Sequence, residues 1–212
     1  MRSFAPLSFF LLWLAVSPVC AAAAMANPVA VVALGDSLTA GYGLDPADGF
    51  VPQLQKALAA EGLAVEIQNA GVSGDTTAQG LARLDWSVPE GTRAVILELG
   101  ANDALRGQDP AAAERNLDAI LARLAERRIP VLLAGMKAPP NMGADYREAF
   151  DAIFPRLAAR HGVALYPFFL EGVAGNAALI QPDGLHPNAQ GVQIIVKSIL
   201  PAVRALLRDV GG

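Results

Sequence analysis

The chain has 212 residues and a formal net charge of −4, and 53% of its residues are hydrophobic. This length suits a single domain with a core large enough to fold without disulfides, and the one cysteine, Cys20, excludes a disulfide framework. The 16 lysines and arginines are scattered, with Arg127-Arg128 as their only adjacent pair, so no nucleic-acid partner is expected.

Residues 1–26 have the pattern of a secretory signal peptide. Arg2 precedes an apolar stretch at 4–16, and small residues suited to cleavage occupy 21–26, with the cleavage position open within 23–26. The alternative is a retained membrane anchor, for which the apolar stretch is short of the about 20 residues that a span needs. We therefore expect export to the periplasm or beyond, no stable membrane insertion after cleavage, and one domain over 27–212.

After this segment, short apolar runs alternate with stretches of helical period. The expected strands are 29–34, 65–68, 94–99, 131–135 and 163–166. The expected helices are 50–60, 77–84, 110–127, 145–160 and 189–207, and Pro201 predicts a kink or a break in the last one. The strand runs do not alternate, which indicates burial on both faces. The pattern predicts an α/β fold, a three-layer α/β/α sandwich with a parallel sheet of about five strands.

Small polar residues gather in the segments that follow the expected strands, where such sheets bind ligands. GDSL at 35–38 follows the first strand, NAGVSGDT at 69–76 the second, and GAND at 100–103 the third. DGLHP at 183–187 precedes the last helix. We expect these four segments to meet at one edge of the sheet.

Ser37 and His186 are the residue types that a nucleophilic hydrolase needs. A serine hydroxyl attacks only beside a base, and imidazole is the base that works near neutral pH. The imidazole needs an acceptor in turn, and Asp183 stands three residues before His186. The plainer interpretation, an Asp-Gly turn with a capping histidine, stays open on the sequence alone. His161, at a helix end before Gly162, is predicted to be structural.

Acyl transfer also needs hydrogen-bond donors for the developing oxyanion, each worth roughly 3–4 kcal/mol of barrier. The backbone N–H of Ser37, the backbone N–H of Gly74 and the side-chain amide of Asn102 are the candidates. Taken alone, Gly74 also fits a plain turn and Asn102 a capping turn. Their common place after the strands favours the functional interpretation.

Together the four segments resemble the motifs of the GDSL, or SGNH, hydrolase family, over residues 31–191. The resemblance implies a flavodoxin-like sandwich (the SGNH hydrolase fold) and a serine esterase that uses no metal and no cofactor. It implies roles for the residues that match: Ser37, Asp183 and His186 as catalytic triad, and Ser37, Gly74 and Asn102 as oxyanion hole. Ala101 stands where glycine is common in the third motif, which is expected to restrict that loop but not to abolish activity. Asp36 is expected to be structural.

Further segments, at 81–84, 105–107 and 167–169, resemble the exported bacterial thioesterase I, lysophospholipase and arylesterase branch. This implies a monomer that acts on small-molecule esters, thioesters or lysophospholipids. Four residues on or beside the strand-end loops are candidates for binding the acyl group, with partial burial as the alternative: Leu105, Pro139, Met142 and Tyr146. The segment 103–109 is expected to close over a bound acyl chain.

Three other functions are weighed. A metallophosphoesterase needs a tight cluster of histidines and carboxylates, whereas this chain has two histidines. A non-catalytic periplasmic binding domain has no use for all five matching site residues. A carbohydrate O-deacetylase of the same family is the alternative that stays open, although no tryptophan-rich groove is visible.

Overall fold

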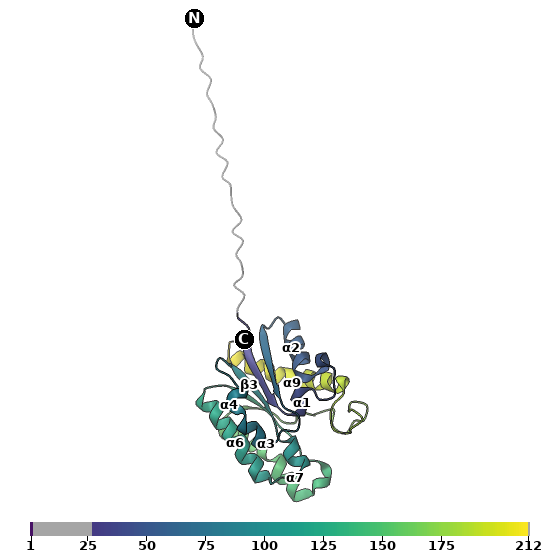
Figure 1. Ribbon diagram of the computed structural model, residues 1–212. Coiled ribbons are helices and arrows are strands. Elements are labelled where there is room, and N and C mark those ends of the chain that lie inside the picture. The colour runs from purple at the N-terminus through teal and green to yellow at the C-terminus, as the bar shows by residue number, and fades with distance from the viewer. Residues whose placement is uncertain (2–26, 212) are drawn as a thin grey trace.

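The structure of the protein is a computed structural model that describes Met1 and residues 27–211 (Figure 1). The predicted signal peptide over 1–26 therefore lies outside the described residues, apart from Met1. A five-stranded sheet in the order β2-β1-β3-β4-β5 forms the centre, and every neighbouring pair is parallel. The strands are β1 (Val29–Gly35), β2 (Val65–Gly71), β3 (Ala94–Glu98), β4 (Val131–Ala134) and β5 (Ala164–Tyr166).

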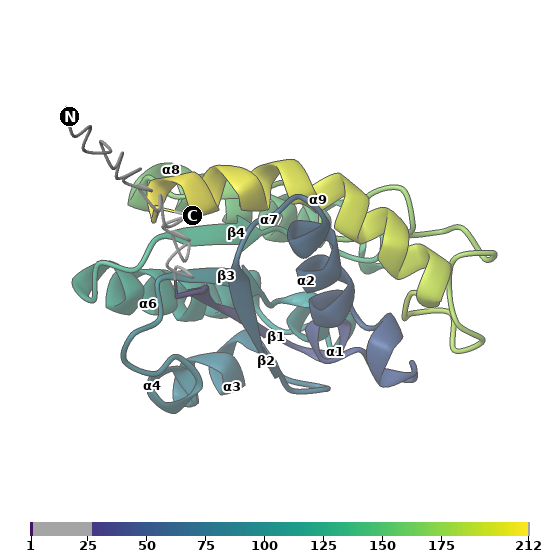
Figure 2. The same cartoon turned by 90° about the horizontal axis from the view of Figure 1, so that it is seen from above.

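Helices cover both faces of the sheet (Figure 1, Figure 2). One face carries the short α1 (Ser37–Ala40), α2 (Phe50–Ala60) and the long α9 (Ala189–Asp209). The opposite layer consists of α3 (Thr77–Ala82), α4 (Leu84–Ser87), α6 (Pro110–Glu126), α7 (Ala144–Asp151) and α8 (Ile153–His161). Shorter pieces are α5 (Ala101–Leu105) and the 3₁₀ turns Pro46–Asp48 and Pro140–Met142. The predicted three-layer α/β/α sandwich with five parallel strands is confirmed.

Burial differs between the central and the edge strands. From Val31 onward β1 is buried, and β3 and β4 are buried throughout, as the unbroken apolar runs predicted. In β2, by contrast, buried Val65 and Ile67 alternate with exposed Glu66 and Gln68. In β5, the other edge strand, Ala164 is exposed and the other two residues are half-buried. The prediction of burial on both faces is thus wrong for both edge strands, which lack a neighbouring strand on one side.

The predicted helix 145–160 is two helices, α7 and α8, which meet at Ala152. Proline has no N–H to donate and its ring collides with the carbonyl four residues back, so it costs least in the first turn of a helix. Pro155 stands in the first turn of α8. The helix therefore restarts at Ile153 instead of continuing.

Pro201 does not break the last helix, which runs unbroken from Ala189 to Asp209. Its apolar face is buried on both sides of the proline, at Ile195 and Ile199 before it and at Val203 and Leu206 after it. Within the described residues, α9 alone is long and apolar enough to span a bilayer, and it is a helix of the domain core.

The strand order creates the place where a site can form. From β1 the chain moves outward to β2 and then crosses back to β3 on the other side of β1. In such sheets a crevice opens between the two strands from which the connections diverge, at their carboxyl ends. β1 ends at Gly35, two residues before Ser37, and β3 ends at Glu98, four residues before Asn102. Two of the four predicted site segments thus flank this crevice.

Candidate active site

Ser37 is the first residue of α1 and follows β1 after one intervening residue, Asp36. The Asp36 side chain caps this helix, since its Oδ1 accepts a hydrogen bond of 3.0 Å from the Leu38 backbone N–H. The first N–H groups of a helix have no intrahelical acceptor. The Ser37 N–H is one of these, so it is available to a ligand at the strand end.

Glycine is required at position 35 by what lies beside it. A Cβ there would overlap Thr39 Oγ1 and would lie 2.7 Å from Glu98 Oε2. Gly35 pairs with Glu98 in the register between β1 and β3. The missing side chain therefore leaves room for the Glu98 carboxyl group directly beneath the turn that carries Ser37.

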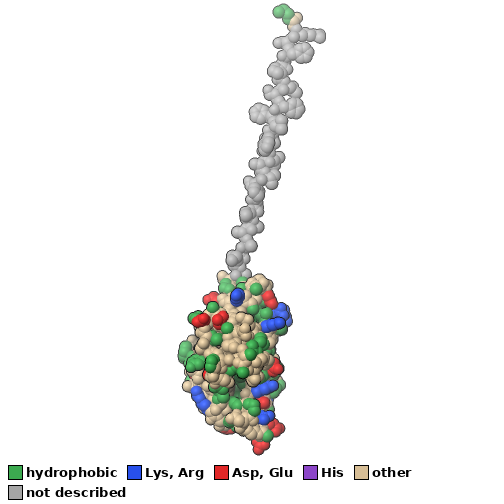
Figure 3. All heavy atoms as spheres, turned by 90° about the vertical axis from the view of Figure 1, so that its right-hand side faces the viewer, with side chains coloured by type: hydrophobic (Ala, Val, Ile, Leu, Met, Phe, Trp, Pro, Cys, Tyr) green, Lys and Arg blue, Asp and Glu red, His purple; other side chains and the backbone are tan. Residues whose placement is uncertain are grey.

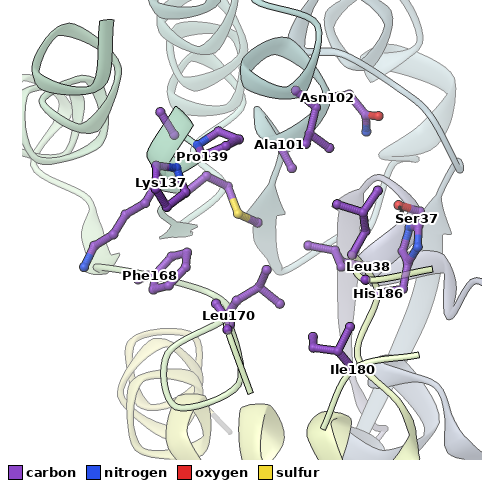
Figure 4. A pocket seen from close by; sticks show the side chains of 18 of the residues that line it. Ser37, Leu38, Ala101, Asn102, Lys137, Pro139, Phe168, Leu170, Ile180 and His186 are labelled. Carbon is purple, nitrogen blue, oxygen red and sulfur yellow. Dashed lines mark hydrogen bonds between the residues drawn. The ribbon is translucent and has the colours of Figure 1, made fainter. Parts of the chain in front are cut away.

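His186 and Asp183 meet Ser37 from the segment that precedes α9. His186 Nε2 lies 2.8 Å from Ser37 Oγ, and Figure 4 shows these two side chains next to each other. His186 Nδ1 lies 2.6 Å from Asp183 Oδ2. Because an ionised carboxylate only accepts, Nδ1 carries the ring hydrogen and donates to Asp183. Nε2 of the neutral ring is then an acceptor for the Ser37 hydroxyl. The geometry is that of a serine with a base and an acceptor for the base.

Asp183 remains ionised over the working range of such a base. Hydrogen bonds from the backbone N–H groups of Leu185 and His186, and then the His186 side chain, lower the pKa of Asp183 to about 2. The two backbone bonds measure 2.9 Å and 3.0 Å and go to Oδ1, which leaves Oδ2 for the imidazole. The Asp-Gly turn that the sequence left open as the plainer alternative is thus present, and it also orients the carboxylate.

Gln181 ties the histidine segment to the serine segment. Its side-chain Nε2 donates to the carbonyl oxygens of Tyr42 and Pro187, at 2.8 Å and 2.9 Å. The Tyr42 ring lies against the His186 ring, with centroids 4.7 Å apart. Sequence reasoning did not find Gln181 or Tyr42, since neither belongs to a motif and 139 residues separate them.

The three residues with candidate oxyanion donors, Ser37, Gly74 and Asn102, line one cavity together with His186. Gly74 has a φ of 87°, a conformation that residues with a side chain rarely adopt. Its carbonyl oxygen accepts from Arg106, and no backbone acceptor for its N–H is found in the part of the chain that the structure describes. Asn102 is in α5, and Figure 4 shows its amide on the side of the cavity where Ser37 and His186 lie.

The Asn102 amide has a partner that sequence reasoning missed. Its Nδ2 donates to Asp36 Oδ2 over 3.0 Å, so Asp36 connects the helix cap to the amide. Asp36 was expected to be structural, and its bond to Leu38 fits this expectation. The contact with Asn102 goes further. The signal for this role in the sequence is an acidic residue that directly precedes Ser37 at the end of an apolar run.

Asp36 and Glu98 are two buried carboxyl groups side by side. Burial raises the pKa of Asp36 to about 6, against hydrogen bonds from Leu38 and Asn102 and the charge of His186, which lower it. Burial and then the Asp36 charge raise the pKa of Glu98 well above its usual range. At neutral pH Asp36 is the ionised member of the pair.

This pair predicts that stability falls as pH rises. An aspartate with a raised pKa holds its proton in the folded state at pH values where the unfolded chain has lost it. The contribution of Asp36 to the free energy of unfolding is therefore greatest below about pH 4 and is lost as pH rises through about 6. Asp36→Asn cannot ionise. We expect the unfolding free energy of the wild type minus that of the variant to decrease by on the order of 2–3 kcal/mol between pH 4 and pH 7. Urea denaturation at both pH values measures it, and a constant difference would contradict the prediction.

Arg83 connects the strand ends beneath the site. Its Nε donates to Asp75 Oδ2 at 2.6 Å, and its Nη1 donates to the Ala70 carbonyl oxygen at 2.8 Å and to Ser87 Oγ at 2.9 Å. Its Nη2 donates to the Gly35 carbonyl oxygen at 2.8 Å. Arg83 therefore holds the end of β1 and the loop of Gly74 in one arrangement.

The cavity beside Ser37 has a volume of about 830 Å³ and a mostly apolar lining. Leu38 and Ile180 lie near Ser37, Leu170 lies in the middle, and Phe168 lies at the far end (Figure 4). The Lys137 ammonium is 4.9 Å from the centre of the Phe168 ring. On the face drawn in Figure 3, basic and acidic side chains are interspersed among apolar and neutral groups.

The four predicted acyl-binding residues divide into two pairs. Leu105 and Pro139 line the cavity. Met142 and Tyr146 are not among its lining residues. Tyr146 is half-buried against the core, and its hydroxyl donates to the Gln108 carbonyl oxygen at 2.8 Å. A role for any of the four in binding substrate stays a prediction, for which the cavity supports the first pair.

Comparison with known proteins finds similarity over most of the chain. Residues 33–194 match the model of the GDSL-like Lipase/Acylhydrolase family. The chain is 42% identical to Esterase TesA of Pseudomonas aeruginosa over 178 residues, which cover 84% of this chain and 89% of that protein. It is 40% identical over 156 residues to Thioesterase 1/protease 1/lysophospholipase L1 of Escherichia coli, with 73% and 74% covered. The crystal structure of AlinE4, described as a SGNH-hydrolase family esterase, superposes with a TM-score of 0.73 at 48% identity and covers 86% of this chain and 98% of that one.

Proposed function

The chain belongs to the GDSL-like lipase/acylhydrolase family and is an ester hydrolase, and from this premise we propose that Ser37, His186 and Asp183 are its catalytic triad. The observation that carries the proposal is the continuous chain of short contacts, 2.8 Å from Ser37 Oγ to His186 Nε2 and 2.6 Å from Nδ1 to Asp183 Oδ2. Ser37 lies near the start of the domain's sequence, and Asp183 and His186 lie near its end. Their side chains meet at the crevice between β1 and β3.

In the first half-reaction Ser37 Oγ attacks the carbonyl carbon of the ester while its proton moves to His186 Nε2. The ionised Asp183 stabilises the imidazolium that forms. The negative charge on the carbonyl oxygen is met by the N–H groups of Ser37 and Gly74 and by Asn102 Nδ2. The intermediate then collapses, the bond to the leaving oxygen or sulfur breaks, and the proton on Nε2 passes to the leaving group.

In the second half-reaction a water molecule attacks the acyl group on Ser37. His186 Nε2 takes the water proton and returns it to Ser37 Oγ as the acid leaves. The same donors stabilise the second oxyanion, because the carbonyl oxygen of the acyl-enzyme occupies the same place. No metal or cofactor enters this scheme.

The apolar cavity supports an acyl chain as the group that the protein binds. Leu38, Leu170 and Phe168 offer the chain a surface that removes it from water, whereas a sugar needs polar partners. This favours carboxylic esters, thioesters and lysophospholipids over the substrates of a carbohydrate O-deacetylase. The contact between His186 and Ser37 argues against a non-catalytic binding domain, because such a domain does not need a base bonded to a serine.

Hydrolysis of p-nitrophenyl esters from acetyl to palmitoyl, with EDTA present, tests the function. We expect turnover that EDTA does not reduce, and labelling of one serine per chain by an alkyl phosphonate ester, with the adduct mapped to Ser37 by mass spectrometry. Activity without phosphonate labelling of Ser37 would refute the assignment of the nucleophile. If the protein hydrolysed none of these esters, the non-catalytic binding domain would be the better interpretation.

Leu170→Trp tests the acyl-binding role of the cavity. An indole in the middle of the cavity shortens the space available to the acyl chain. We expect kcat/KM for the decanoyl ester to fall by about tenfold or more and that for the acetyl ester to change by less than about threefold, because methylene groups each contribute about 0.8 kcal/mol when buried. Ala178→Trp is the matched control. Ala178 lies in the same segment between β5 and α9, but it is exposed and does not line the cavity. Equal losses on both esters would show that the acyl chain binds elsewhere.

We further propose that residues 1–26 are removed on export and that 27–212 acts as one domain in the periplasm or outside the cell. The apolar stretch at 4–16 supports this proposal. We also propose that the protein is a monomer, because few large apolar side chains of residues 27–211 are exposed outside the cavity. Of the five that are exposed, Tyr42, Leu105 and Leu185 line the cavity, and the other two are Val72 and Trp86.

A further inference from the structure

Beneath Ser37 lie two carboxyl groups that the proposed reaction does not use. Asp36 and Glu98 are both 0% exposed. They reach this place from different strands, Asp36 after β1 and Glu98 at the end of β3. Buried carboxyl groups are costly to desolvate, so each is expected to be matched by partners.

Asp36 has such partners on both oxygens. Oδ1 accepts from the Leu38 backbone N–H, and Oδ2 accepts from Asn102 Nδ2, each over 3.0 Å. A carboxylate only accepts, so it selects the NH₂ side of the Asn102 amide and rejects the flipped form. With one Nδ2 hydrogen engaged by Asp36, the other is free for the oxyanion.

Glu98 is matched on one oxygen only. Its Oε2 accepts from Thr39 Oγ1 over 2.7 Å and from the Asp36 backbone N–H over 3.4 Å. Its Oε1 is buried and has no hydrogen-bond partner among the described residues. An ionised Glu98 would place a second negative charge beside Asp36 in the buried interior, whereas a proton on Oε1 makes the group neutral and keeps Oε2 as the acceptor.

We propose that Asp36 and Glu98 are a positioning pair for the oxyanion site, in which Asp36 fixes the Asn102 amide with Nδ2 toward Ser37 and the un-ionised Glu98 holds the turn of Asp36 from beneath. The inference rests on the proposed function, since it assigns the pair to the oxyanion site of that reaction. Neither carboxyl group touches substrate.

The ionisable groups around the pair agree with this division. Toward Asp36 face Glu98 from β3 and His186 from the segment before α9, and Arg83 of the α3–α4 connection reaches the neighbouring Gly35 carbonyl oxygen. Burial and the Asp36 charge hold the pKa of Glu98 well above its usual range. His186, when it is protonated, thus favours the charged form of Asp36, which is the member that carries the charge.

A double-mutant cycle separates positioning from general support. In Asp36→Asn the new NH₂ group can only donate, so one of the two donors that Asp36 served loses its acceptor. We expect Asp36→Asn to lower kcat by about 10- to 100-fold with KM changed by less than about threefold, and Asn102→Ala to lower kcat by about 10²- to 10³-fold. In the Asn102→Ala background, Asp36→Asn should have an effect smaller than about twofold. Losses that multiply would overturn the proposal, because Asp36 would then not act through Asn102.

Glu98 supplies a second test that does not depend on Asp36→Asn folding. Glu98→Leu removes the acceptor for Thr39 and should lower kcat by about tenfold or more. Glu98→Gln keeps a carbonyl oxygen at the place of Oε2 and should restore most of this loss. The infrared band of a protonated carboxyl group should be present in the wild type at pH 8 and absent in Glu98→Gln. Equal impairment of the two variants, or no such band, would show that Glu98 is ionised and refute the proposal.

The failure of this inference is distinguishable from that of the proposed function. If the wild type hydrolyses esters and phosphonate labels Ser37, the function stands whatever the cycle shows. Multiplying losses would then remove only the positioning pair.

Discussion

Ser37→Ala is expected to lower kcat for p-nitrophenyl esters by about 10⁴- to 10⁶-fold, with the domain still folded. The hydroxyl is the group that forms the acyl-enzyme, and no other serine or cysteine of the described residues lies within hydrogen-bond distance of His186 Nε2. The substitution removes one oxygen from a half-buried position at a helix start, so the thermal midpoint should change little. Stopped assays with a large excess of the variant measure the residual rate.

His186→Ala provides the control for this prediction. The two residues act as one unit, so each single variant should lose about as much as the double variant. A Ser37→Ala protein that retained wild-type activity would show that another nucleophile acts, and the contact between Ser37 and His186 would then be structural. His161→Ala should retain activity, because His161 ends α8 and its ring contacts Asp118, away from the cavity.

Arg83→Met is expected to destabilise the domain by about 3–5 kcal/mol, which corresponds to a fall of roughly 10 °C in the thermal midpoint. Arg83 is 7% exposed and donates to four groups, the Asp75 carboxylate, the Ser87 hydroxyl and the carbonyl oxygens of Ala70 and Gly35. Methionine fills much of the volume but leaves the buried carboxylate of Asp75 without a counter-charge. Urea denaturation of the variant measures the loss.

Arg123→Met is the matched control for this variant. Arg123 Nη2 lies 2.8 Å from Asp85 Oδ2, but the two side chains are 48% and 66% exposed. Exposed ion pairs contribute about 1 kcal/mol or less, so the control should change stability within that limit. A small loss in Arg83→Met would show that water replaces the guanidinium, and the account of Arg83 as the link between the strand ends would be wrong.

The family and the fold could be predicted from the sequence because their signals are local. An apolar run that lacks alternation indicates a buried strand, and β1, β3 and β4 lie where such runs occur. The errors were also local in origin. The split at Ala152 follows from Pro155, and the alternation of Glu66 and Gln68 in β2 shows an edge strand. Pro201 predicts a kink or a break but lies inside a continuous helix, because burial of the flanking turns outweighs one lost hydrogen bond.

The sequence by itself determined which residues could do the chemistry, since a serine, a histidine with an aspartate three residues before it, a turn glycine and an asparagine stand after strands or before a helix. Only the tertiary structure decided that Ser37 and His186, 149 residues apart, lie 2.8 Å from each other. It alone also decided that Asp36 accepts from Asn102 and that Glu98 fills the space beside Gly35. The physical reason is that sequence patterns report the preferences of neighbouring residues. Contacts between distant residues depend on strand order and register, which the packing of the whole sheet sets.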